Sequence, residues 1–426
     1  MNTNSTDAFD LGQDMGEDLN VGGGIVDWSR AQSVAERVLL RKPCISNYHR
    51  DSLQSDFTDL TRQAEQLVAE ATGWDPVGGP ARARVVDRRE WVEANLKSIK
   101  RLLGPTMEKL ELQRSTKAAN GSVGSNDSVG SNGSVGSNGS KDLTVSPQIS
   151  TLAKSMRGLF SKGPLDMTGV GRTVSGAQLG LILAWMSSRV LGQYDLLVTD
   201  ESGEDQDLVY YVGPNIIGVE QCYGFSPRQF RLWIALHELT HRGQFTAVTW
   251  LRDYFLTLVD KGLEPLTSDP QQFGDVIRRI TSEVRAGRSP IGDAGLLGLL
   301  TTPEQLEAFE KAQALMSLLE GHGDVMMNRA GEGVLTGARR FSDVLRQRRK
   351  SAKGAAKLIQ SAFGMEVKLR QYRDGEEFVT MVESTGGPEL FNQVWNGPDW
   401  LPTLAEIRDP KLWVARVDSG VTSVAR

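Results

Sequence analysis

The chain has 426 residues, of which 39% are hydrophobic and 24% charged, and its formal net charge is −5. This is the composition of a globular protein, and the small negative charge gives no reason to expect nucleic acid or an anionic membrane as a partner. Two cysteines are too few for a disulfide framework. The first thirty residues contain no apolar signal core, and no apolar run approaches the roughly 20 residues that cross a bilayer. We therefore expect a cytoplasmic protein.

The N-terminal part is predicted to begin with a disordered lead over residues 1–24, followed by a helical region over 25–113. The hexapeptide Ser122-Val-Gly-Ser-Asn-Asp127 comes next and recurs twice, with small changes, up to residue 139. Because a segment rich in glycine and serine cannot bury a core, residues 114–142 are interpreted as a flexible insertion without a catalytic role. The acids of the repeat lack the regular spacing of a calcium-binding loop.

A small sheet is predicted in the second half of the chain. After a helix over 174–190, strands are expected at Tyr194–Val198 and Leu208–Val212, on either side of an acidic turn over 200–205. The predicted fold is thus predominantly α, of the α+β kind, with a small β-sheet immediately before the next helix. An edge strand in that position could hold an extended peptide by backbone pairing.

That next helix carries His237-Glu238-Leu239-Thr240-His241 and begins at Ser226-Pro227, where serine suits the cap and proline the first helical position. Two histidines four residues apart project from one face of a helix and can share a metal ion. The glutamate between them is placed to hold metal-bound water as a general base, which makes H-E-x-x-H the signature of zinc metallopeptidases. The competing interpretation is a pair of hydrogen-bonded core histidines in an ordinary amphipathic helix.

A catalytic zinc ion keeps three protein ligands and a water, so one more ligand is needed. We expect it on a helix that begins near Thr302, because Thr302 and Gln305 fit a capping box. An apolar stripe along this helix leads to Glu320. The stripe is Leu306, Phe309, Ala312 and Met316. A charged side chain on a buried stripe must be paired or coordinated, which favours Glu320 as the third ligand. Asp324 is expected to receive the spare N–H of a ligating histidine.

His322 is the alternative third ligand, in which case Glu320 would be a buried, hydrogen-bonded acid. On a regular helix, however, His322 lies about 200° around the axis from Glu320. His322 and Tyr372 are also our candidates for the donor that stabilises an oxyanion. The fourth histidine, His49, lies in a polar stretch and is predicted to be on the surface.

Seven short strings occur along residues 25–415: Val26-Asp-Trp28, Asp87-Arg-Arg-Glu-Trp-Val92, Leu191-Gly-Gln-Tyr-Asp195, His237-Glu-Leu-Thr-His241, Leu319-Glu-Gly-His-Gly-Asp324, Lys368-Leu-Arg-Gln-Tyr-Arg-Asp-Gly375 and Leu401-Pro-Thr-Leu404. In content and order they resemble a family of bacterial zincin-like metallopeptidases with a gluzincin-type motif. The resemblance implies a mostly helical zincin-like fold, with His237, His241 and Glu320 as zinc ligands and Glu238 as the base. Some relatives are described as hydrolases and others as associated with deazaflavin-coenzyme biosynthesis. The repeat at 122–139 departs from the family's pattern, which supports an insertion.

Together these patterns predict a zinc-dependent hydrolase that cleaves a peptide or small amide through a zinc-activated water. The alternative is a catalytically inactive, zinc-stabilised scaffold or binding protein, which could be linked to deazaflavin-coenzyme metabolism. A structural zinc site needs a fourth protein ligand, and the sequence offers no obvious one, which favours the enzyme. The predicted regions are a lead (1–24), a helical region (25–113), the insertion (114–142), a zincin-like catalytic region (143–415) and a tail (416–426). The catalytic region is expected to pack with the helical region.

Overall fold

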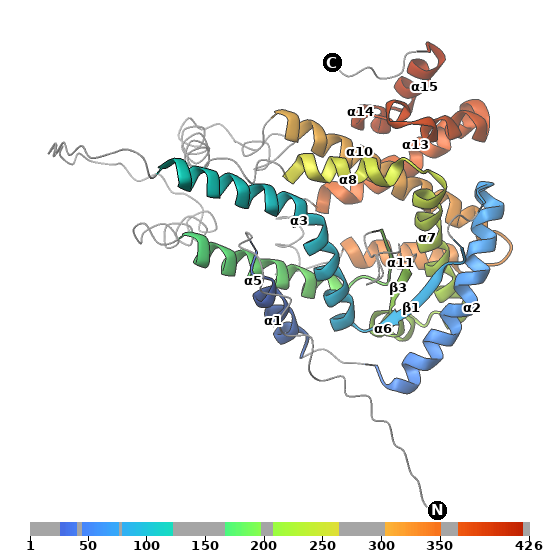
Figure 1. Ribbon diagram of the computed structural model, residues 1–426. Helices are drawn as coiled ribbons and strands as arrows, with labels where there is room; N and C mark the ends of the chain where they lie inside the picture. The colour runs from blue at the N-terminus through green and yellow to red at the C-terminus, as the bar shows by residue number, and fades with distance from the viewer. Residues whose placement is uncertain are drawn as a thin grey trace, which may run out of the picture. The chain divides into compact units, whose positions relative to one another are not determined.

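The computed structural model describes residues 26–40, 45–75, 79–121, 167–196, 208–263, 303–350 and 365–420. Helices dominate these residues, and three short strands form one mixed sheet (Figure 1). The predominantly α, α+β class predicted from the sequence is confirmed. The chain forms two compact units, and the larger unit, residues 35–106 and 182–426, contains the sheet and the His237–His241 motif.

The described helices, with 3₁₀ helices written η, are α1 (Trp28–Leu39), α2 (Asn47–Thr72), α3 (Arg88–Gly121), α5 (Met167–Ser187), α6 (Gly213–Tyr223), α7 (Pro227–Ala247), α8 (Leu251–Leu263), α10 (Pro303–Ala330), α11 (Ala338–Lys350), α13 (Met365–Phe391), η3 (Asn392–Asn396), η4 (Pro398–Trp400), α14 (Leu404–Arg408) and α15 (Pro410–Asp418). In the smaller unit α5 packs closely on α1, because a Cβ at Gly180 would lie 2.1 Å from the carbonyl oxygen of Ala31. None of the helices in the described part of the chain has the length and apolar character needed to cross a bilayer.

The strands are β1 (Arg82–Val86), β2 (Gly192–Asp195) and β3 (Leu208–Val212). They pair in the order β1-β3-β2, with β1 parallel and β2 antiparallel to β3. The two predicted strands are present, although β2 begins two residues earlier than expected and ends at Asp195 instead of Val198. β1 is a correction, because it interrupts a region that the periodicity indicated to be helical. It becomes a strand by pairing with β3, which is far away in the sequence, and local periodicity cannot show such a pairing.

The boundaries of the predicted regions differ in detail from the described elements. The helix expected over 174–190 is present as α5. α3 continues to Gly121, so helical structure extends past residue 113 into the segment interpreted as an insertion. The repeat at 122–139, the lead at 1–24 and the acidic turn at 200–205 lie outside the described residues.

Two apolar cores meet within the larger unit. The first joins α2 and β3 to the first half of α7, and it also contains Met327 and Ala330 at the end of α10. The second joins α8, α13 and the C-terminal helices to the middle of α10, and it contains Val248 just after α7. α7 and α10 are therefore each anchored in both cores. Along both helices, the candidate ligands lie near the point where the residues of one core end and those of the other begin.

The starts of α7 and α10 only partly match the sequence analysis. Ser226 is the residue before α7, but its side chain makes no capping hydrogen bond. α10 begins at Pro303, and Thr302 lies outside the described residues. The capping box of Thr302 and Gln305 therefore stays a prediction, while Gln305 donates to the backbone carbonyl of Gly262 at the end of α8, at 3.2 Å. The helices are thus placed mainly by the packing of their buried faces.

The apolar stripe predicted on α10 is buried only in part, because Leu306 and Ala312 are half-buried but Phe309 and Met316 are not. Phe309 and Met316 are 44% and 40% exposed. The buried residues include Ala308, Leu315, Leu318, Leu319, His322 and Met326. Apolar side chains occur on more than one side of this helix, so spacing alone does not identify the side that packs on α7 and α13. His49, by contrast, is exposed as predicted, and its Nδ1 lies 2.9 Å from Ser46 Oγ.

Candidate metal centre

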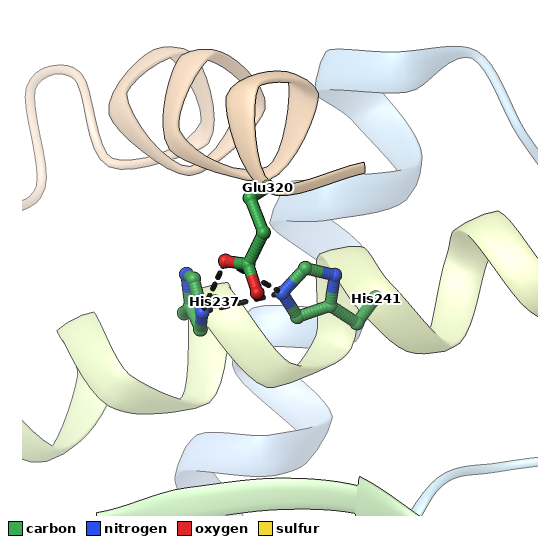
Figure 2. A group of neighbouring side chains, drawn as sticks. All are labelled: His237, His241 and Glu320. Atoms are coloured by element: carbon green, nitrogen blue, oxygen red, sulfur yellow. Dashed lines mark hydrogen bonds and ion pairs between the residues drawn. The ribbon is translucent and has the colours of Figure 1, made fainter. Parts of the chain in front are cut away.

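His237 and His241 extend from one face of α7, and Glu320 extends from α10 toward the space between their rings (Figure 2). The two Nε2 atoms are 3.2 Å apart, and Glu320 Oε2 lies 3.9 Å from Nε2 of His237 and 3.8 Å from Nε2 of His241. A tetrahedral zinc ion about 2 Å from each ligand holds its ligands roughly 3.3 Å apart. Small side-chain movements would therefore bring these three atoms to zinc-binding distances.

The donor set and its electrostatics fit a cation. Two imidazoles and a carboxylate are ligands that zinc accepts, and their donor atoms lie within 4.8 Å of one another. Burial lowers the pKa of His241, but the negative charges of Glu320 and Glu238, the hydrogen bond with Gln244 and the charge of Asp324 together raise it, and the net shift is upward. The site thus favours an added positive charge.

The candidate ligands are partly open to solvent. Their side chains are 26% exposed for His237, 16% for His241 and 19% for Glu320. In the part of the chain that the structure describes, no fourth His, Cys, Asp or Glu joins this cluster. Three protein ligands with solvent access correspond to the open coordination of catalytic zinc, whereas structural zinc is closed by four protein ligands.

Glu238 is buried and held in place by β2. Its Oε2 accepts a hydrogen bond from the backbone N–H of Tyr194 at 3.0 Å. A Cβ at Gly192 would lie 2.6 Å from Oε1, so the carboxylate packs directly on the strand. Burial raises the pKa of Glu238 to about 7, although the charge of His241 and the Tyr194 hydrogen bond act in the opposite direction. A carboxylate with such a pKa is suited to accept a proton near neutral pH.

His322 does not lie with the three candidate ligands. It is buried among the rings of Trp74, Phe391 and Trp395, and it stacks on Phe391 with the ring centroids 5.5 Å apart. Burial lowers its pKa to about 3, so the ring is neutral at physiological pH. The geometry therefore favours Glu320 over His322 as the third ligand, and the oxyanion role of His322 stays a prediction.

The structure gives fewer contacts for the other two predicted site residues, Asp324 and Tyr372. Asp324 is half-buried one turn beyond Glu320, and its charge helps to raise the pKa of His241, after the larger influences of burial, Glu320 and Glu238. Its hydrogen bond to a ligating histidine stays a prediction. Tyr372 belongs to α13, but its side chain lies outside the described residues.

Gln244 is a site residue that the sequence analysis missed. It is fully buried, and its Oε1 lies 2.9 Å from Nδ1 of His241. Its position three residues after His241 was the available signal, because such a residue lies on the same side of the helix.

Two glycines of α10 allow the close packing that positions Glu320. A Cβ at Gly323 would lie 3.3 Å from Cε1 of His241, so this glycine faces the ring of a candidate ligand. Gly321 faces α13, where its Cβ would lie 2.1 Å from the carbonyl carbon of Gly375. Together they let α10 lie close to both α7 and α13, as small residues do wherever backbones approach.

Comparison with known proteins agrees with this geometry. The sequence pattern of the zincin-like metallopeptidases matches residues 26–414, and the chain belongs to that family. A crystal structure from Chloroflexus aurantiacus, of a candidate hydrolase described as having a novel fold, is similar to the chain with 27% sequence identity and a TM-score of 0.58. The similarity covers 92% of this chain and 99% of that one. None of the curated proteins matches significantly. The family and the solved structure together support a zinc hydrolase.

Proposed function

We propose that the protein is a zinc-dependent hydrolase that cleaves a peptide or a related amide bond. The observation that carries this proposal is the convergence of His237, His241 and Glu320 next to a buried and oriented Glu238. These three residues would hold a zinc ion, which would supply the Lewis acidity that makes water a nucleophile near neutral pH.

Glu238 acts as the general base in this proposal. The Tyr194 N–H holds Oε2, which fixes the plane of the carboxylate relative to α7. The carboxylate takes a proton from the attacking water and then passes it to the leaving nitrogen. The raised pKa of Glu238 suits both steps, because the acid that forms must give its proton away again.

β2 offers a place for an extended substrate. It is at the end of the described sheet, and Leu191 just before it accepts a hydrogen bond from the backbone N–H of Val212 in β3. Because backbone groups alternate in direction along a strand, those of Gly192 and Tyr194 face away from β3. The Tyr194 N–H indeed points toward Glu238. We propose that a substrate backbone lies along this edge, next to the base.

Incubation of the zinc-loaded protein with a mixture of peptides, followed by mass spectrometry, tests the proposed function. We expect cleavage products that disappear when a chelator removes the metal and return when zinc is added. A folded, zinc-loaded protein that cleaves neither peptides nor small amides would overturn the proposal and favour a zinc-stabilised scaffold.

Gly192→Ala should reduce turnover while zinc remains bound. The added methyl group would lie 2.6 Å from Glu238 Oε1, so the base must move. A displacement of about 1 Å at a reacting group can reduce the rate by about 10²-fold. Gly218→Ala is the matched control, because a Cβ at this position in α6 meets no atom within 4 Å. Equal turnover numbers for the two variants would contradict the position assigned to Glu238.

The rate should also depend on pH through Glu238. A general base must be deprotonated, so kcat/KM is expected to fall as the pH drops through the pKa of this carboxyl group. Burial raises that pKa to about 7, and a nearby cation lowers it, so the loss should begin on the acidic side of neutrality. A profile of kcat/KM that stays flat down to about pH 4, where an ordinary glutamate is already mostly protonated, would exclude Glu238 as the base.

A further inference from the structure

The side-chain amide of Gln244 connects the two helices that carry the candidate ligands. Oε1 lies 2.9 Å from His241 Nδ1 on α7. Nε2 donates to the backbone carbonyl of Leu319 on α10 at 2.8 Å, and Leu319 directly precedes Glu320. Nε2 also lies 3.0 Å from Nδ1 of His322. Gln244 is fully buried, so these contacts are not shared with bulk solvent.

These contacts determine where the protons are. A backbone carbonyl can only accept, so the Gln244 atom that faces Leu319 must be the NH₂ group. The carbonyl oxygen of the amide then faces His241, and because that oxygen can only accept, Nδ1 of His241 must carry a proton. In a neutral imidazole with a proton on Nδ1, Nε2 has the free lone pair. Nε2 of His241 is the atom that faces His237 and Glu320.

His322 completes the same network from the other side. The second N–H of the Gln244 amide points to His322 Nδ1, which must accept and therefore carries no proton. Trp74, Phe391 and Trp395 enclose this ring and hold its orientation. The burial of His322, two residues from Glu320, is thus explained by this hydrogen-bond network, without any need for the ring to bind metal.

We propose that Gln244 is a positioning residue for the metal centre: it keeps the proton of His241 on Nδ1, so that Nε2 presents its lone pair to the metal, and it ties Glu320's helix to α7. The inference rests on the metal site of the proposed function but not on the reaction. A hydrogen-bonded partner on the other ring nitrogen orients a ligating histidine and increases its basicity.

The tautomer of His241 can be measured directly in the wild-type protein before zinc is added. The chain has four histidines, so their ring nitrogens can be assigned by ¹⁵N nuclear magnetic resonance with single substitutions. At a pH high enough for the ring to be neutral, we expect a protonated Nδ1 and an unprotonated Nε2 for His241. A neutral His241 with its proton on Nε2 would overturn the inference, and this measurement needs no variant of Gln244 to fold.

Gln244→Met then tests the consequence for the metal. Methionine keeps the length of the side chain but lacks the amide, so the proton of His241 is no longer held on Nδ1. We expect a mixture of tautomers and a zinc affinity reduced by roughly 10- to 100-fold in competition with a chromophoric chelator.

Gln305→Met is the matched control. Gln305 is also a buried glutamine that donates to a backbone carbonyl, that of Gly262, and it lies away from the candidate ligands. This variant should lose some stability but bind zinc as the wild type does. Equal zinc affinities for the two variants would overturn the inference. A weaker affinity of Gln244→Met alone would support it even if no substrate were ever cleaved, so it and the proposed function can fail separately.

Discussion

Replacing Glu238 with glutamine is expected to stop most of the turnover while zinc stays bound. Glutamine has nearly the shape of glutamate, and its side-chain oxygen can still accept the hydrogen bond from the Tyr194 N–H. It cannot take a proton from water, so the general-base contribution is lost. Such contributions are worth roughly 10²- to 10⁴-fold in rate, which is the expected decrease in kcat. Steady-state kinetics and zinc content should be measured on the same preparation.

Glu406→Gln provides the comparison for this variant. Glu238 and Glu406 are each 7% exposed, and both have hydrogen-bonded carboxylates. Glu406 caps α14 and pairs with Arg416, at a distance of 2.6 Å from the guanidinium, and has no contact with the candidate ligands. Its substitution should lower the melting temperature without a specific effect on kcat. If Glu238→Gln turned over substrate as fast as Glu406→Gln, the proposed mechanism would be wrong.

The local parts of the site could be predicted from the sequence because a single helix fixes them. His237, Glu238 and His241 are placed relative to one another by the geometry of α7 alone. Glu320 was chosen on a weaker argument, an apolar stripe of α10 that is buried only in part. The residue nevertheless lies with the histidines, because the middle of α10 packs against α7.

The long-range parts could not be predicted in this way. β1 is a strand because it pairs with β3. Gly192 affects the position of the Glu238 carboxylate because β2 packs on that side chain. The role of Gln244 depends on the carbonyl group of Leu319, and no spacing rule connects two residues so far apart in the chain. In each case the decisive partner comes from another element, and a sequence pattern carries no information about it.

Removing the Glu320 carboxylate should weaken zinc binding strongly. This result would distinguish Glu320 from His322 as the third zinc ligand. The free energy of zinc binding to a structural site with four ligands is about 10–16 kcal/mol. Divided equally, each ligand contributes about 2.5–4 kcal/mol, or roughly 10²- to 10³-fold in zinc affinity. Glu320→Ala is expected to lose about this much, and so is His237→Ala. His49→Ala should bind zinc as the wild type does, because His49 is exposed and bonded to Ser46.

His322→Phe is the informative partner of Glu320→Ala, because phenylalanine preserves the ring that stacks on Phe391. If His322 were the third ligand, this variant would lose as much zinc affinity as His237→Ala, and Glu320→Ala would lose little. The structure predicts the opposite order. The loss in His322→Phe should be smaller than that in Glu320→Ala, because His322 is hydrogen-bonded to Gln244 rather than to a candidate ligand, and Leu319 still holds Gln244. Zinc titrations of the three variants against one chelator decide between these orders without any knowledge of the substrate.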